Sequence, residues 1–199
     1  MADHWWWRPG WRVGRRFHTW HLTFEDQPDV QRFVAAYRDA LTGLEGLDLI
    51  PDRWLHLTMQ GVGFTDEVSA TDLEAIVDAV RARLLRIPAF DIHFTKASVT
   101  PEAVESFAEP AERVRDVRNA VRAGIADVWG HVPEAADGFK PHVSVAYSSA
   151  DGPAAPVLEA VERANVPPAT ARVASVQLIT LNRDARMYEW EPVAEIPLG

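Results

Sequence analysis

The chain has 199 residues, of which 47% are hydrophobic and 25% are charged, and this composition predicts one globular domain with enough apolar material for a core. It contains no cysteine, which excludes disulfides, thiolate catalysis and cysteine-ligated zinc. A net charge of −9 makes it a poor general ligand for duplex DNA, whose phosphates require a broad basic face.

The chain opens with an N-terminal arm, residues 1–16, whose composition differs from the rest. Residues 1–20 hold four arginines against one aspartate, a net charge of +3, together with five of the eight tryptophans. Arginine mixed with aromatic residues suits a phosphate-bearing ligand with a stackable base. The alternative is that these tryptophans pack on the body of the protein, as tryptophans more often do.

Neither a membrane segment nor a secretory signal is visible. No apolar run approaches the ~20 residues that a bilayer-spanning helix needs. The N-terminus lacks a basic stretch followed by an apolar one. We therefore expect a cytoplasmic location and no membrane partner.

Strands and helices are expected to alternate along the chain. Residues 17–25 alternate between apolar and polar positions, which predicts a strand, and residues 29–41 have apolar side chains at helical spacing. The same two patterns predict the remaining elements. Further strands are expected at 53–62, 89–99, 104–108, 139–147, 172–181 and 187–196, and further helices at 69–85, 111–129 and 157–164.

The same order of elements occurs twice in the chain. A helix, a strand with a histidine motif, a second helix and a hairpin occur once in residues 29–110 and again in residues 111–199. Helices mixed with hairpin-linked strands predict an α+β fold with mostly antiparallel sheets. We expect one domain over residues 1–199, with lobes of approximately 17–110 and 111–199 that can exchange strands.

Four histidines are followed two positions later by a hydroxyl residue. With 17 Ser and Thr in 199 residues, chance alone gives roughly 0.6 such pairs among seven histidines. Residues i and i+2 of a strand share a face, so each imidazole has a hydroxyl beside it. The four pairs are His21 with Thr23, His56 with Thr58, His93 with Thr95, and His142 with Ser144.

This pairing suits phosphoryl chemistry. In-line displacement at phosphorus needs a base on the attacking side and an acid on the leaving side, and histidine, with a pKa of ~6.5, can serve as either. A neighbouring hydroxyl supplies a donor for the charge that develops on the non-bridging oxygens. No metal or other cofactor is required, and the sequence has no His-x-His or His-Glu-x-x-His pattern.

Two segments, Trp54–Gly63 and Phe139–Tyr147, carry a family resemblance. They resemble the paired His-x-Thr/Ser motifs of the two-histidine (2H) phosphoesterase superfamily, and in particular its LigT-like members, often labelled 2′-5′ RNA ligases. The resemblance implies a bilobal fold with pseudo-two-fold symmetry and a central cleft lined by the sheets, with helices outside. It also implies hydrolysis of 2′,3′-cyclic phosphates, or cleavage and joining of 2′-5′ linkages.

The resemblance assigns catalytic roles to four residues. His56 would protonate the leaving oxygen and His142 would activate water, although the two roles can be exchanged. Thr58 and Ser144 would hold the phosphate oxygens. His93 lacks the flanking residues of the family motif and is expected to be non-catalytic.

The sequence departs from the family pattern after each motif. Gly61-Val62-Gly63 stands where the family often has Phe-Leu-Gly, and Tyr147 stands where it often has arginine. Lys140, expected on the same strand face as His142, would supply the missing charge. The residues expected to bind substrate in the cleft are His21, Thr23, Gln60 and Lys140.

The predicted function is therefore a metal-independent phosphodiesterase. Its expected partner is a nucleotide or RNA with a cyclic phosphate or a 2′-5′ linkage, and the sequence leaves protein partners unknown. Two alternatives remain open at this point. One is a non-catalytic module that binds nucleotides or RNA ends, and the other is an RNA 2′-5′ ligase or end-processing factor that uses the N-terminal arm.

Overall fold

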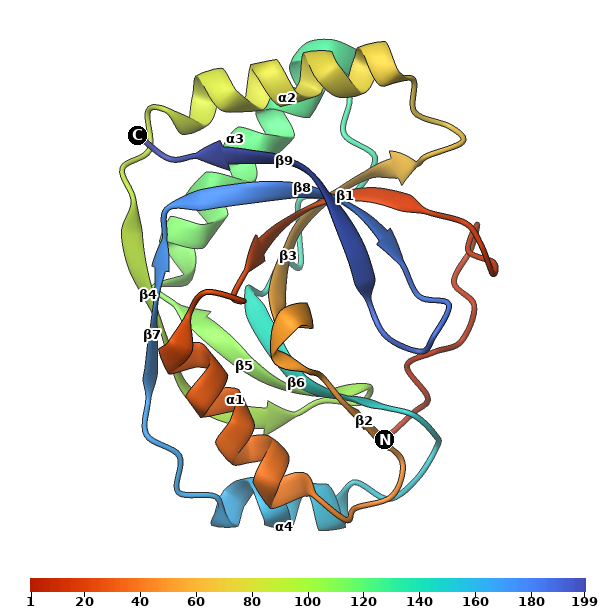
Figure 1. The fold of residues 1–199 in the computed structure, drawn as a ribbon, viewed down its shortest axis with the longest axis vertical. Helices are drawn as coiled ribbons and strands as arrows, with labels where there is room; N and C mark the ends of the chain where they lie inside the picture. Colours follow the sequence, from red (N-terminus) through yellow and green to blue (C-terminus); the bar gives the residue numbers. More distant parts are fainter.

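The computed structural model describes residues 1–199, which form two antiparallel sheets with helices outside them (Figure 1). The first sheet has four strands in the order β3-β1-β8-β9, and the second has five in the order β2-β6-β5-β4-β7. Every strand pairing is antiparallel. The α+β class with two mostly antiparallel sheets is thus confirmed.

The strands of the first sheet are β1 (Phe17–Thr23), β3 (His56–Phe64), β8 (Ser175–Asn182) and β9 (Glu189–Pro197). Helices α2 (Ala70–Leu84) and α3 (Ala111–Trp129) pack on each other and on this sheet. In Figure 1 these two helices lie at one end of the molecule.

The strands of the second sheet are β2 (Leu47–Leu49), β4 (Phe90–Val99), β5 (Ala103–Glu109), β6 (His142–Ser148) and β7 (Ala169–Val173). Helices α1 (Pro28–Leu41) and α4 (Ala155–Arg163) cover this sheet at the opposite end of the molecule. A short 3-10 turn, η1 (Asp52–Trp54), precedes β3.

Each sheet draws strands from both halves of the chain. β8 and β9 come from the C-terminal half but extend the sheet of β1 and β3, whereas β4 and β5 join β6 and β7. The two sheets meet where β3 contacts β6. Residues far apart in sequence are therefore brought together between the sheets.

The two motif strands are buried on one face by the alternation that the sequence predicts. Leu57, Met59, Val143 and Val145 are all at most 2% exposed and belong to one core of 42 buried apolar residues. Since alternate strand residues point to opposite faces, these four side chains leave the other face of each strand to the histidines and hydroxyls.

The structure differs from the expected elements in several places. The single strand expected over 172–181 is two strands in different sheets, because the chain leaves β7 after Val173 and enters β8 at Ser175. The last helix spans 155–163 rather than 157–164. β2 and η1 were not expected, since three residues are too few to show a periodicity. No helix of this fold has the length and apolar character needed to cross a membrane.

Candidate active site

A cavity of about 180 Å³ lies between the two sheets. Strand β3 contributes His56 and Thr58 to its wall, and strand β6 contributes His142 and Ser144. The four residues expected to be catalytic therefore surround one space. The complete lining consists of His4, Arg8, His56, Thr58, Glu105, His142, Ser144, Tyr147 and Tyr188.

Both motif histidines are oriented by the same backbone device. The Nδ1 of His56 lies 2.8 Å from the carbonyl oxygen of Trp54, and the Nδ1 of His142 lies 2.8 Å from that of Lys140. A carbonyl can only accept, so in each ring Nδ1 carries the proton and donates it. The Nε2 atom of each neutral imidazole is then left with a free lone pair for chemistry.

His56 lies deep in the first sheet and is 9% exposed. Its ring stacks on His21 with centroids 4.4 Å apart and planes 5° from parallel, and it meets Trp190 edge to face with centroids 5.2 Å apart. Burial lowers the pKa of His56 to about 4; the bond to the Trp54 carbonyl opposes this shift and the charge of His142 adds to it. The rings of His56 and His142 are thus close enough for their charges to interact.

His142 lies in a more open environment. Its side chain is 35% exposed, and its Nε2 is 3.5 Å from a carboxylate oxygen of Glu105. Glu105 is on β5, where it pairs in register with Ser144. When His142 is protonated, this carboxylate is its ion-pair partner. No pattern in the sequence pointed to Glu105, because only the strand pairing brings it beside β6.

His21 lies behind His56 and does not line the cavity. It is 1% exposed, its Nε2 lies 3.3 Å from the Thr58 hydroxyl, and its Nδ1 is buried without a hydrogen-bond partner. Burial, reinforced by the charge of His56, holds the pKa of His21 well below its ordinary value. A neutral His21 supports the ring of His56 and the hydroxyl of Thr58.

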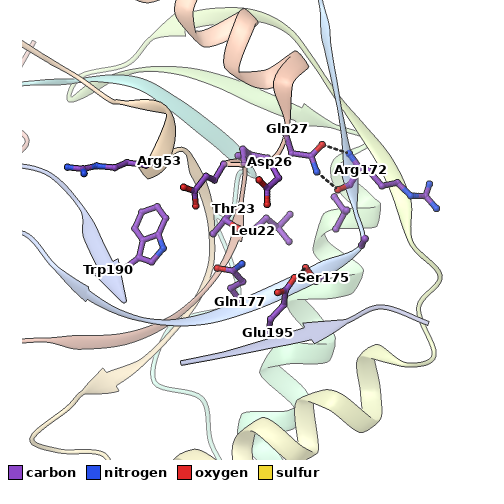
Figure 2. A pocket seen from close by; sticks show the side chains of 14 residues that line it. Leu22, Thr23, Asp26, Gln27, Arg53, Arg172, Ser175, Gln177, Trp190 and Glu195 are labelled. Carbon is purple, nitrogen blue, oxygen red and sulfur yellow. Dashed lines mark hydrogen bonds between the residues drawn. The ribbon is translucent and has the colours of Figure 1, made fainter. Parts of the chain in front are cut away.

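The other three residues expected to bind substrate also lie outside the cavity. Thr23 lines a separate hollow with Gln27 and Trp190 (Figure 2). Gln60 is fully buried, where it accepts from Arg122 and donates to Glu134. Lys140 is exposed and precedes β6, so that only its carbonyl reaches His142.

The position of Gln60 has a structural cause. His21 of β1 pairs with Thr58 of β3, whereas the adjacent β1 residue, Trp20, pairs with Gln60. One residue of β3 between Thr58 and Gln60 is therefore left without a partner on β1. This extra β3 residue is a bulge, and a bulge interrupts the strict alternation of side chains. The expectation that Gln60 shares the face of Thr58 assumed that alternation continued.

The N-terminal arm contributes two residues to the cavity that the sequence did not identify individually, His4 and Arg8. The His4 ring stacks on Tyr147 with centroids 4.3 Å apart, and its Nε2 lies 3.0 Å from the Tyr188 hydroxyl. Burial, helped by Arg8 and by a second nearby arginine, lowers the pKa of His4 to about 3. The arm therefore forms part of the cavity wall. The mixture of arginine and aromatic residues in the arm was the sequence feature that pointed to a role in ligand binding.

The tryptophans of the arm divide between packing and exposure. Trp5 is buried, and its indole nitrogen donates to Asp48 at 2.8 Å. Trp6 and Trp7 are about half exposed, at 51% and 50%. The alternative of an arm packed on the body holds for Trp5 but not for these two.

A family model described as the 2′-5′ RNA ligase superfamily matches residues 25–185. The chain belongs to this superfamily of two-histidine phosphoesterases. The match includes both histidine motifs and begins after the N-terminal arm. The LigT-like assignment made from the motifs is thereby confirmed.

Several solved structures share the fold at low sequence identity. TT0787 of Thermus thermophilus superimposes with a TM-score of 0.67 at 21% identity, covering 92% of this chain and 97% of that one. E. coli LigT complexed with 3′-AMP gives 0.67 at 16% identity, covering 92% and 98%. The MHV ns2 PDE domain gives 0.54 at 11% identity, covering 83% and 99%. A search of curated protein sequences found no match.

Proposed function

We propose that this phosphoesterase is a metal-independent phosphodiesterase that hydrolyses the 2′,3′-cyclic phosphate or 2′-5′ linkage of a nucleotide or RNA end. The observation that carries the proposal is the convergence of His56 and His142, from two different sheets, on one cavity with a hydroxyl beside each. Crystal structures of E. coli LigT complexed with phosphate and with 3′-AMP support this class of ligand.

In the proposed reaction His56 is the general base. With a pKa of about 4, roughly one His56 ring in 1,000 is protonated at pH 7, so the ring is ready to accept a proton and poorly suited to donate one. As water attacks phosphorus, one of its protons passes to the Nε2 of His56. This assignment exchanges the roles that the family resemblance implied.

His142 is then the general acid. Its Nε2 donates a proton to the 2′ or 3′ oxygen as the bond from phosphorus to that oxygen breaks, and Glu105 stabilises the protonated ring beforehand. The products are a phosphomonoester and a free hydroxyl. The hydroxyls of Thr58 and Ser144 face the same space and donate to the non-bridging oxygens as their charge grows.

The test is turnover of 2′,3′-cyclic AMP and a 2′-5′ dinucleotide in the presence of EDTA. General acid–base groups contribute about 10²- to 10⁴-fold each, so His56→Ala and His142→Ala should each lower kcat by that factor. His93→Ala is the matched control, because His93 also belongs to a His-x-Thr pair but is exposed on β4 and does not line the cavity. No turnover by the wild type, or full activity of either cavity variant, would overturn the proposal.

A second candidate, an RNA end-processing factor, is favoured by the two exposed indoles of the arm. Trp6 and Trp7 offer surfaces on which RNA bases can stack, and such stacking contributes about 1–3 kcal/mol per base. In this case Trp6→Ala and Trp7→Ala would weaken turnover of a cyclic-phosphate oligonucleotide and leave the mononucleotide rate unchanged. Equal effects on both substrates would count against it.

A further inference from the structure

The cavity contains a single arginine and no lysine. Of its nine lining residues only Arg8 carries a fixed positive charge, whereas Glu105 brings a negative one. His4, the other residue from the arm, is neutral at pH 7 because burial and two nearby arginines lower its pKa to about 3. An anionic phosphodiester that enters the cavity therefore meets one side chain with a permanent positive charge.

We propose that Arg8, delivered by the N-terminal arm, is the phosphate-binding cation of this site. The inference rests on the proposed function and deepens it. It makes the arm, which lies outside the matched family region of residues 25–185, a part of the active site. It also gives to Arg8 the role that the sequence suggested for Lys140, which lies outside the cavity.

The body of the protein fixes the arm through backbone hydrogen bonds to His4 and Trp6. The buried guanidinium of Arg183 donates to the carbonyl oxygens of His4 and Trp6, at 3.0 and 3.4 Å. The backbone N–H of His4 donates to the carbonyl oxygen of Ser148 at the end of β6. These bonds hold the segment that leads to Arg8 in one place, so the position of Arg8 does not depend on a loose chain end.

The Arg8 guanidinium is oriented but not saturated. One terminal nitrogen donates to Glu102 at 3.0 Å, while its Nε is buried and has no hydrogen-bond partner. The other terminal nitrogen is not buried and makes no hydrogen bond within the protein, so it is the donor left for a phosphate oxygen in the cavity. Glu102 also contacts His4 and the indole nitrogen of Trp6, so it helps to hold the arm in position.

Guanidinium chemistry fits this task. Arginine presents several N–H donors in a fixed plane and binds phosphate oxygens through short, charge-assisted hydrogen bonds. The guanidinium would also offset the repulsion between the phosphate and Glu105. Arg8 would thus lower KM through binding and raise kcat through stabilisation of the transition state.

The test compares Arg8→Gln and Arg8→Lys with the wild type in turnover of 2′,3′-cyclic AMP and in inhibition by inorganic phosphate. Loss of charge-assisted hydrogen bonds should lower kcat/KM and raise the Ki of phosphate by about 10- to 100-fold in Arg8→Gln, with partial recovery in Arg8→Lys. Arg12→Gln is the matched control, since Arg12 is on the same arm but is exposed and does not line the cavity. Its kinetics should be unchanged.

A double variant separates phosphate binding from simple neutralisation of Glu102. If Arg8 binds phosphate, Arg8→Gln combined with Glu102→Gln remains as defective as Arg8→Gln alone, and thermal unfolding shows both variants folded. Recovery of activity in the double variant, or a wild-type phosphate Ki in Arg8→Gln, would overturn the inference. Such a result alongside inactive His56→Ala and His142→Ala would leave the proposed function intact.

Discussion

The two histidine motifs share a backbone geometry but lie in different surroundings. In each, the imidazole donates to the carbonyl two residues earlier and presents its Nε2 to the cavity. His56 is packed against His21 and Trp190, whereas His142 is 35% exposed and faces Glu105. A repeated motif can therefore supply two different proton-transfer groups, because its neighbours separate their proton affinities.

The difference comes from residues outside the motifs. β1 and β9 cover the His56 side with aromatic rings, while β5 brings a carboxylate to the His142 side. In both cases these neighbours are far from the histidine in the sequence. The buried motif and the open motif should therefore respond differently to substitution and to pH.

After the two histidines themselves, the largest effect on turnover is expected at the hydroxyls. Thr58→Val and Ser144→Ala should each lower kcat by about 100-fold, since each removes a donor to the developing charge. Thr95→Val, in the exposed third motif, should leave kcat unchanged. Thr58→Val also removes the contact with His21, so it should be the more harmful of the two. Steady-state kinetics with a 2′,3′-cyclic nucleotide checks this, and near-normal rates in both variants would argue against hydroxyl participation.

The next largest effect is expected in the free energy of unfolding, which the two histidine substitutions should lower by different amounts. His56→Ala removes a buried ring that packs against His21 and Trp190, and we expect a loss of about 2–3 kcal/mol in the free energy of unfolding. His142→Ala should cost less than about 1 kcal/mol, because its ring is partly exposed. Urea denaturation at pH 7 measures both. Equal losses would mean that the two motifs are buried alike.

The smallest effect concerns pH. The pKa of His56 is lowered to about 4, so this ring stays neutral as the pH falls from 6.5 to 5, and kcat/KM should not decline in this range. It should fall only as the pH approaches about 4, where His56 becomes protonated. If both histidines had the ordinary value of ~6.5, kcat/KM would drop roughly eightfold between pH 6.5 and 5. A drop of that size would contradict the buried character of His56.

Much of this arrangement could be predicted from the sequence. Alternation over residues 53–62 and 139–147 indicated the two motif strands and the core positions such as Leu57 and Val143, which are buried. The family resemblance, based on the same two segments, implied the bilobal fold with antiparallel sheets. Local periodicity was sufficient there because each strand has one buried and one cavity face.

Features that depend on distant partners could not be predicted. The bulge opposite Trp20 and His21 that moves Gln60 away from the cavity is a property of the strand pair, not of one strand. Glu105 reaches His142 only through the register of β5 with β6. Arg8 reaches the cavity through tertiary contacts of the arm. The composition of the arm indicated a role in ligand binding but not where the arm lies in the fold.

Joint action of His56 and His142 is tested by combining the two histidine substitutions in one variant. Since His56 and His142 are proposed to act as one unit on one phosphorus, each single variant should be slow, and His56→Ala/His142→Ala should be within about tenfold of the slower single variant in kcat. Rates are measured with 2′,3′-cyclic AMP in EDTA. Wild-type turnover in either single variant, or losses that multiply fully in the double variant, would contradict joint catalysis by the pair.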